Sequence, residues 1–185
     1  MIPSTLLGTA NIPNNGGELR LTQRGSDFSI HLKGVRGELM NSRTHCSELA
    51  LAELGCAHIQ DMEKAKVLVG GMGMGFTLAA ALKATSSTAQ VIVAELVPEV
   101  IEWNKGPLGA CAGKPLDDKR VLVHLGDVAE LFKTKKAAYD AVLLDVDNGP
   151  EGFTQNDNNK LYSTESLQAI RQTLHPRGML AIWSA

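Results

Sequence analysis

The chain has 185 residues and a formal net charge of −2, a length that suits one domain with its own core. The mildly acidic balance, with a pI near 6.2, excludes a basic face for a nucleic-acid backbone and a polybasic membrane patch. No window is apolar enough to span a bilayer, and residues 1–17 lack a signal-peptide pattern, so we expect a loose N-terminal arm there. The three cysteines are widely spaced without a CxxC pair, which argues against a disulfide framework and a zinc site and favours a reduced, cytoplasmic protein.

Residues 18–38 are predicted to form a β-hairpin subdomain. In "ELRLTQRGSDFSIHLK" apolar and polar residues alternate on both sides of "RGSD", which supplies turn chemistry. The following "MNSRTHCSELALAELGCAHI" carries apolar residues near helical spacing. Ser42 or Ser47 is the expected N-cap of that helix.

From residue 66 the chain alternates short apolar runs with helical patterns. We expect strands over 67–69, 91–94, 121–124, 141–144 and 179–183, and helices over 77–84, 98–104, 128–132 and 163–174. Near-continuous apolar strands are typical of a sheet that is covered on both faces. Their alternation with helices predicts an α/β fold, with a Rossmann-like, doubly wound parallel sheet over residues 39–185.

The turn after the first strand of that sheet, in "VLVGGMGMGFTL", is rich in glycine: Gly70, Gly71, Gly73 and Gly75. Glycine allows positive φ and the close approach of a ligand to the backbone. A dinucleotide fingerprint would need its third glycine at Phe76. The G-x-G-x-G spacing, with two apolar methionines in it, therefore favours a phosphate-free nucleoside such as S-adenosylmethionine over NAD.

Acidic residues follow the next two strands. Glu95 ends the second strand, where a carboxylate can accept hydrogen bonds from both ribose hydroxyls. Asp127 comes just past the third strand, where it can bind the exocyclic amine of adenine. Asp127 is equally suited to be the N-cap of a helix that begins at Val128, and both interpretations can hold at once.

The loop after the fourth strand is the most acidic part of the sequence. Asp145 ends the strand, and three more acids follow it: Asp147, Glu151 and Asp157. Like charges crowded in a cleft raise one another's pKa, so a carboxylate here can accept a proton from an amine, and the cluster attracts a cationic substrate. "DNGP" supplies a turn. An EF-hand is excluded because its sixth and twelfth positions would be Pro150 and Asn156.

Five stretches after the hairpin carry a family resemblance, in this order: "LMNSRTHCSE", "VLVGGMGMGFTL", "VIVAELVPEVIEW", "GDVAELF" and "YDAVLLDVDNGPEG…LY". Over residues 18–185 the chain resembles the spermidine synthase-like family. This is the polyamine aminopropyltransferase branch of the class I S-adenosylmethionine-dependent transferases. Many methyltransferases share the glycine turn, whereas the hairpin and the acidic fourth loop are more specific to the polyamine branch.

The resemblance assigns eight residues to the nucleoside: Gly71, Met72, Gly73, Gly75, Glu95, Leu96, Asp127 and Val128. Among them, Glu95 matches the acid that binds the ribose, and Asp127 matches the acid near the adenine. The resemblance assigns the deprotonation of the attacking amine to Asp145.

The resemblance also assigns the acceptor side. Asp147 matches the second, diamine-binding aspartate, in a shorter loop than the family's. Glu48 falls at the glutamate of the family's Tyr-His-Glu motif, with Cys46 and Ser47 in place of the other two residues. That replacement puts putrescine specificity in question. Tyr162 follows the acidic loop, where it can cap the acceptor pocket.

Three functions fit these features. The first is aminopropyl transfer from decarboxylated S-adenosylmethionine to a small amine, without a metal. The second is methyl transfer from intact S-adenosylmethionine to an unknown acceptor, with Arg43 or His45 binding the donor's carboxylate. The third is a non-catalytic nucleoside-binding homologue. The family's sheet has further strands after "MLAIWSA", so the edge strand is expected to be unprotected. That edge and the family together imply a homodimer.

Overall fold

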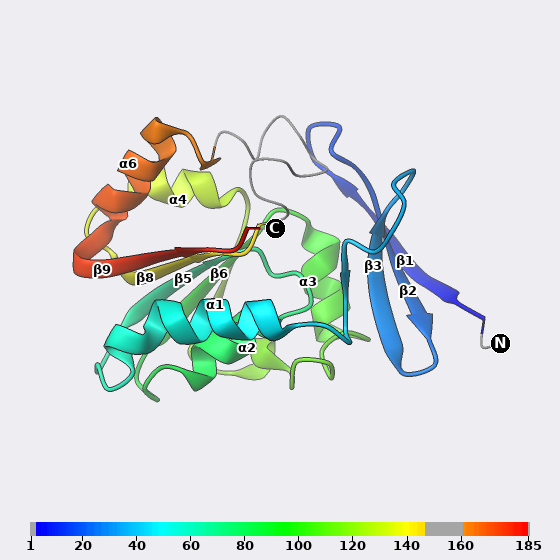
Figure 1. Cartoon of the computed structure of the whole chain (residues 1–185), viewed down its shortest axis with the longest axis horizontal. Helices are drawn as coiled ribbons and strands as arrows, with labels where there is room; N and C mark the ends of the chain where they lie inside the picture. The colour runs from blue at the N-terminus through cyan, green and yellow to red at the C-terminus, as the bar shows by residue number, and fades with distance from the viewer. Residues whose placement is uncertain (1–2, 147–160, 185) are drawn as a thin grey trace.

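The computed structural model describes residues 3–146 and 161–184, which form two sheets side by side (Figure 1). The first is an antiparallel sheet of four strands in the order β1-β2-β3-β4. The second is a parallel sheet of five strands in the order β7-β6-β5-β8-β9. Helices cover both faces of the parallel sheet, so the predicted doubly wound α/β fold is confirmed.

The N-terminal sheet contains β1 (Thr5–Ile12), β2 (Gly17–Arg24), β3 (Asp27–Leu32) and β4 (Met40–Asn41). The predicted hairpin is β2–β3, and its turn contains Gly25 at φ +62°. The expectation of a loose arm over 1–17 is wrong for β1. That strand pairs with β2 from Thr5↔Gln23 to Ile12↔Gly17, through a turn in which Asn14 and Asn15 adopt positive φ. The sheet therefore spans residues 5–41 rather than 18–38.

The parallel sheet contains the predicted strands with slightly wider bounds: β5 (Lys66–Gly70), β6 (Gln90–Glu95), β7 (Val121–Leu125), β8 (Tyr139–Leu144) and β9 (Leu174–Ile182). Its helices are α1 (Cys46–Cys56), α2 (Phe76–Lys83), α3 (Pro98–Lys105), α4 (Val128–Thr134) and α6 (Thr164–Thr173), with short 3-10 turns η1 (Ala57–Ile59) and η2 (Pro115–Asp117). None of these helices in the described ranges is long and apolar enough to cross a membrane.

Side chains of the central strands alternate between two cores, as the pleat of a sheet requires. In β5, Val67 and Val69 belong to the core that includes residues of α1, α2 and α3. Leu68 belongs to the core that includes residues of α4 and α6. All three are completely buried. The two edge strands are exceptions to the predicted two-sided cover, because Leu122 and Leu125 on β7 are half-exposed and Met179 on β9 is also exposed.

Helix α1 begins at a different residue from the one expected. Its N-cap is His45, without a side-chain capping bond, and neither Ser42 nor Ser47 has that position. The turn before the helix is stabilised by Asn41 instead, whose Oδ1 accepts hydrogen bonds from the backbone N–H groups of Arg43 and Thr44, both at 3.0 Å.

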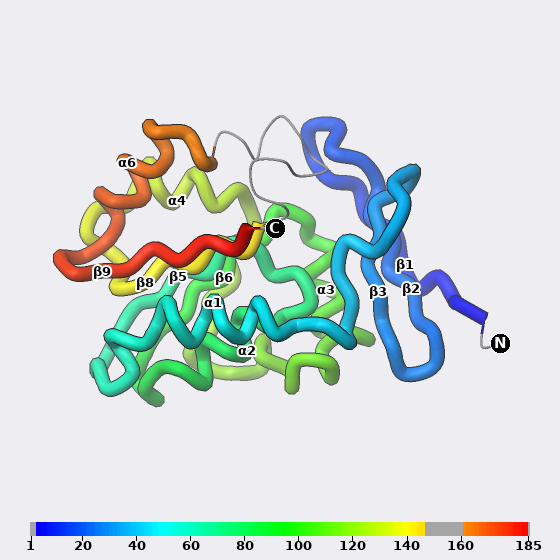
Figure 2. Tube along the Cα trace, in the orientation of Figure 1, coloured from blue at the N-terminus to red at the C-terminus, as the bar shows by residue number. Residues whose placement is uncertain are grey.

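This architecture brings the site together. In a parallel sheet the carboxyl ends of all strands meet at one edge, so the residues after β5, β6, β7 and β8 converge there. Helix α3 lies between that edge and the N-terminal sheet (Figure 2). The N-terminal sheet therefore closes one side of the space above the strand ends.

Candidate functional site

The glycine turn is tied to both neighbouring strands. Gly71 N–H donates to the carbonyl of Ala94 on β6, and Asp145 N–H donates to the carbonyl of Gly70, both at 2.8 Å. Gly71 adopts φ +93°, and a Cβ on it would lie 2.3 Å from the carbonyl oxygen of Asp145. No other residue type fits this position, because both the backbone conformation and the space exclude a side chain.

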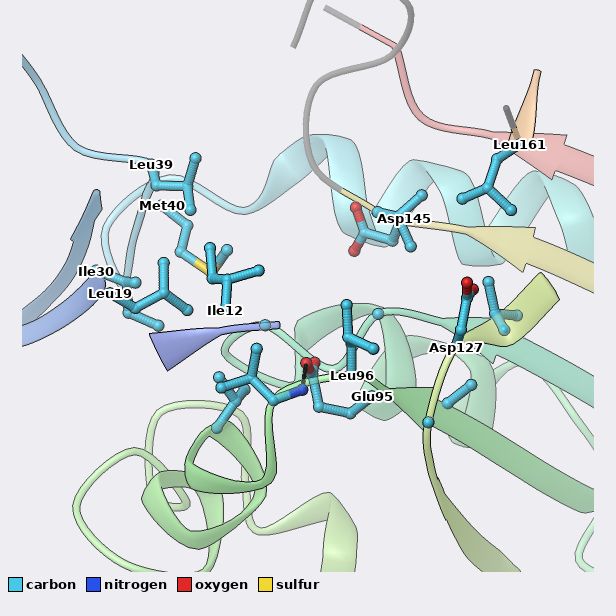
Figure 3. Close-up of a pocket in the computed structure, with 18 residues that line it drawn as sticks. Ile12, Leu19, Ile30, Leu39, Met40, Glu95, Leu96, Asp127, Asp145 and Leu161 are labelled. Atoms are coloured by element: carbon cyan, nitrogen blue, oxygen red, sulfur yellow. Dashed lines mark hydrogen bonds between the residues drawn. The ribbon is translucent and has the colours of Figure 1, made fainter. Parts of the chain in front are cut away.

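A cavity of about 150 Å³, open to solvent, lies above the turn. Figure 3 shows the carboxylates of Glu95, Asp127 and Asp145 around it, and Ile12 and Ile30 of the N-terminal sheet on the other side. Most of the predicted nucleoside residues line it: Gly71, Gly73, Glu95, Leu96, Asp127 and Val128. The apolar lining from β1 to β4 is a part of the site that sequence reasoning missed.

Glu95 is buried at the end of β6, with 9% of its surface exposed. Its Oε2 accepts a hydrogen bond from Met72 N–H at 2.9 Å, and its Oε1 accepts one from Val97 N–H at 2.8 Å. Burial raises the pKa of Glu95, while these backbone donors oppose the rise. Glu95 also lines the first cavity, and its contact with the ribose hydroxyls stays a prediction.

Asp127 caps helix α4. Its Oδ1 accepts a hydrogen bond from Ala129 N–H at 2.9 Å, and its φ and ψ are extended, as expected of an N-cap. Asp127 also lines the cavity. The predicted cap is therefore confirmed, while the contact with adenine stays a prediction.

Asp145 stands at the end of β8, where a second cavity meets the first. The hydroxyl of Thr77 on α2 donates to its Oδ2. Burial raises the pKa of Asp145 to about 6, the hydrogen bond from Thr77 opposes this, and the negative charge of Glu48 adds to it. The sequence predicted a raised pKa from crowded acids, whereas burial is the larger cause.

The second cavity, of about 70 Å³, is lined mainly by thioether, aromatic and acidic side chains. Glu48 and Asp145 are its acids, and its apolar and aromatic walls are Leu39, Met40, Met72, Met74, Phe76 and Trp183. His45 stacks on Phe76 at 4.2 Å between ring centroids. Predicted Met72 lines this cavity rather than the first.

Other predicted residues lie elsewhere. Gly75 lines neither cavity, because it packs behind the turn beside Asn104. Tyr162 packs with the core under α4 and α6 instead of lining a cavity. Arg43 forms an ion pair with Glu38 at 2.6 Å.

The acids Asp147, Glu151 and Asp157 lie outside the described residues. Within the described ranges, no group of three or more His, Cys, Asp or Glu side chains is arranged to bind a metal.

A profile of the Spermine/spermidine synthase domain matches residues 48–184, well over half of the chain. The chain belongs to this family. The chain is 33% identical to a polyamine aminopropyltransferase of Prochlorococcus marinus over 123 residues. These residues cover 66% of this chain and 41% of that protein. A polyamine aminopropyltransferase of Saccharolobus solfataricus is 30% identical over 112 residues, 60% of this chain and 36% of the relative. The chain thus spans less than half the length of these curated relatives.

Solved structures show the same fold. A spermidine synthase in complex with the transition state analogue AdoDATO superimposes with a TM-score of 0.73 at 20% identity, covering 92% of this chain and 55% of that one. Spermidine synthase from Thermotoga maritima gives a TM-score of 0.71 at 19% identity, covering 96% and 56%. The family's fold therefore includes the N-terminal sheet of this chain as well as its parallel sheet.

Proposed function

We propose that this protein transfers an aminopropyl group from decarboxylated S-adenosylmethionine to a small amine. The observation that carries the proposal is the place and the pKa of Asp145. Its carboxyl group lies where the two cavities meet, and its pKa is about 6. A base of that pKa is ionised at neutral pH and can take a proton from an amine. The relatives named polyamine aminopropyltransferase support this choice of reaction.

The charge of the site supports the decarboxylated donor over the intact one. The described residues that line the two cavities include the acids Glu48, Glu95, Asp127 and Asp145, and no Lys, Arg or His. Such a site attracts a donor with a sulfonium and an ammonium group, and it has no cation for a carboxylate. Of the two residues considered for that carboxylate, Arg43 is paired with Glu38, and His45 stacks on Phe76 without lining either cavity.

In the proposed reaction the donor nucleoside lies over the glycine turn, and the amine enters the second cavity. Asp145 removes a proton from the amine, whose lone pair then forms a bond with the carbon next to the sulfonium sulfur. That carbon–sulfur bond breaks, and its electron pair stays on sulfur as methylthioadenosine leaves. Holding both reactants in line supplies most of the catalysis.

The remaining assignments belong to the same proposal. Glu95 binds the ribose, Asp127 binds adenine, and Glu48 with Asp147 orients the acceptor. The reaction needs no metal, and the protein acts as a cytoplasmic homodimer. Its free thiols, Cys46, Cys56 and Cys111, fit a reducing compartment.

The test uses the purified chain with decarboxylated and intact S-adenosylmethionine and a panel of mono- and diamines. Chromatography follows methylthioadenosine and alkylated amine. We expect methylthioadenosine to form with the decarboxylated donor only, and the Asp145→Asn variant to bind the donor without turning it over. Methyl transfer from intact S-adenosylmethionine would overturn the proposal in favour of a methyltransferase. Binding of methylthioadenosine without turnover of either donor would identify a non-catalytic homologue.

A further inference from the structure

Helix α3 carries a buried amide that contacts the glycine turn. Asn104 has 3% of its surface exposed. Its Nδ2 donates to the carbonyl of Gly73 at 2.8 Å and to the carbonyl of Val100, one turn earlier on the helix, at 2.9 Å. Both partners are carbonyl oxygens, which only accept, so the orientation of the amide is set by its surroundings.

The turn is thereby held from two sides. On one side, Met72 N–H donates to Glu95 at 2.9 Å. On the other side, the carbonyl of the next residue, Gly73, accepts from Asn104. Gly73 lines both cavities and adopts φ +49°. The position of its peptide therefore affects the surface under the nucleoside and the entrance to the second cavity together.

The amide oxygen of Asn104 shows that fold stability alone does not explain why this position holds an asparagine. Its Oδ1 is buried without a hydrogen-bond partner in the described part of the chain, and it lies where a Cβ on Gly75 would approach to 3.1 Å. A buried acceptor without a partner destabilises the folded state. An apolar side chain of the same size would fill the space without that cost, but it would release the carbonyl of Gly73.

We propose that Asn104 is a positioning residue for the donor nucleoside. It does not line either cavity, and it acts by fixing the carbonyl of Gly73 and hence the backbone on which the nucleoside lies. This inference rests on the proposed function, because it takes the turn as the nucleoside site. It adds a residue that sequence reasoning left unassigned.

The test compares wild type with Asn104→Leu, which keeps the number and branching of the side-chain heavy atoms, and Asn104→Ala, which removes the side chain beyond Cβ. Isothermal titration calorimetry measures the Kd of methylthioadenosine, and steady-state kinetics measures both KM values. Losing one buried hydrogen bond should raise the Kd of methylthioadenosine about tenfold. The KM of the decarboxylated donor should rise with it, and the KM of the amine should rise by a smaller factor, because Gly73 also lines the second cavity.

A matched control is Thr173→Val on α6. Thr173 is fully buried and its Oγ1 donates to the carbonyl of Ile170 at 2.7 Å, so this variant also loses one buried hydrogen bond to a backbone carbonyl, away from the turn. It should melt earlier and bind methylthioadenosine with the wild-type Kd. A wild-type Kd in folded Asn104→Ala would overturn the inference. If Asn104→Leu does not fold, the Kd of methylthioadenosine for Asn104→Ala alone decides whether the inference holds. Failure of wild type to bind methylthioadenosine would count against the proposed function instead.

Discussion

At the scale of single residues, Asp145 combines burial with a hydroxyl donor and a nearby acid. Protonated Asp145 cannot accept a proton, so kcat/KM should fall as the pH drops through about 6. The hydrogen bond from Thr77 lowers the pKa of Asp145, so Thr77→Val should move this acid limb to higher pH. The measurement is the pH profile of kcat/KM, which reports groups of the free enzyme. An acid limb that stays in place in Thr77→Val would show that another group controls it.

The same carboxyl group should make the folded state less stable at high pH. Its pKa is about 6 in the folded chain against an ordinary value of 3.8, so between these values the unfolded chain loses the proton first. The free energy of unfolding therefore falls as the pH rises through this window. Above it, the full cost is at most roughly 3 kcal/mol.

The variant Asp145→Asn removes the charge and keeps an oxygen that can accept from Thr77. It should melt at a higher temperature than wild type at pH 8, and at nearly the same temperature below the ordinary pKa of aspartate. Thermal unfolding at the two pH values checks this. The expectation fails if the variant melts below wild type at pH 8. A base that lowers the stability of its own fold is a frequent feature of functional sites.

At the same scale, the sequence predicts the positions of the acidic residues at the site better than it predicts the residues that surround them. Glu95, Asp127 and Asp145 were found because each follows an apolar strand, and parallel strands bring their ends together. The sequence did not place Asn104, Phe76 and Trp183 near the site, because their positions depend on contacts between distant segments. Trp183 follows the last strand of the sheet, which was the one signal available for it.

At the scale of elements, the turn after β5 depends on glycine for two separate reasons at Gly71. Gly71→Ala should suffer both the strain of φ +93° and a collision at 2.3 Å with the backbone of Asp145. A matched control is Gly34→Ala, at φ +84° with nothing in the described structure within 4 Å of the added Cβ. The control should lose about 1 kcal/mol, and Gly71→Ala should lose more than about 3 kcal/mol together with methylthioadenosine binding.

Denaturant unfolding and calorimetric titration of the two variants provide the measurement. Equal losses of stability would mean that the backbone of Asp145 moves away easily, so the turn would not be held as tightly as its hydrogen bonds suggest.

Elements were predictable to different degrees. Strands β5, β6 and β8 are short, continuous apolar runs that remain buried on both faces, so their signal is local. Strand β1 has no such signal. Its Leu6 and Leu7 are exposed, and the strand exists because it pairs with β2. Pairing with the preceding strand, β3, likewise defines β4, whose two residues carry no pattern of their own.

At the scale of the whole molecule, the proposed donor would contact two sheets at once. The first cavity is lined by Gly71 and Glu95 from the parallel sheet and by Ile12 and Ile30 from the N-terminal sheet. Trp103 on α3 connects the two, since its indole lies where a Cβ on Gly8 of β1 would approach to 2.8 Å. A ligand between the two sheets should therefore stabilise both, because binding to the folded state alone suppresses local opening.

Hydrogen exchange with and without methylthioadenosine tests this arrangement directly. Amides of 8–12 and 28–32 should gain protection together with those of 70–75, although the two groups belong to different sheets. Amides of α6, which packs on the opposite face of the parallel sheet from α1 and α2, serve as the internal control and should change least. Replacing Ile12 with Ala should weaken binding and remove most of the added protection in β1, because this side chain is the part of β1 that lines the cavity. Protection confined to 70–75 and its neighbours would show that the N-terminal sheet lies beside the ligand without contacting it. Residues of the parallel sheet alone would then bind the ligand.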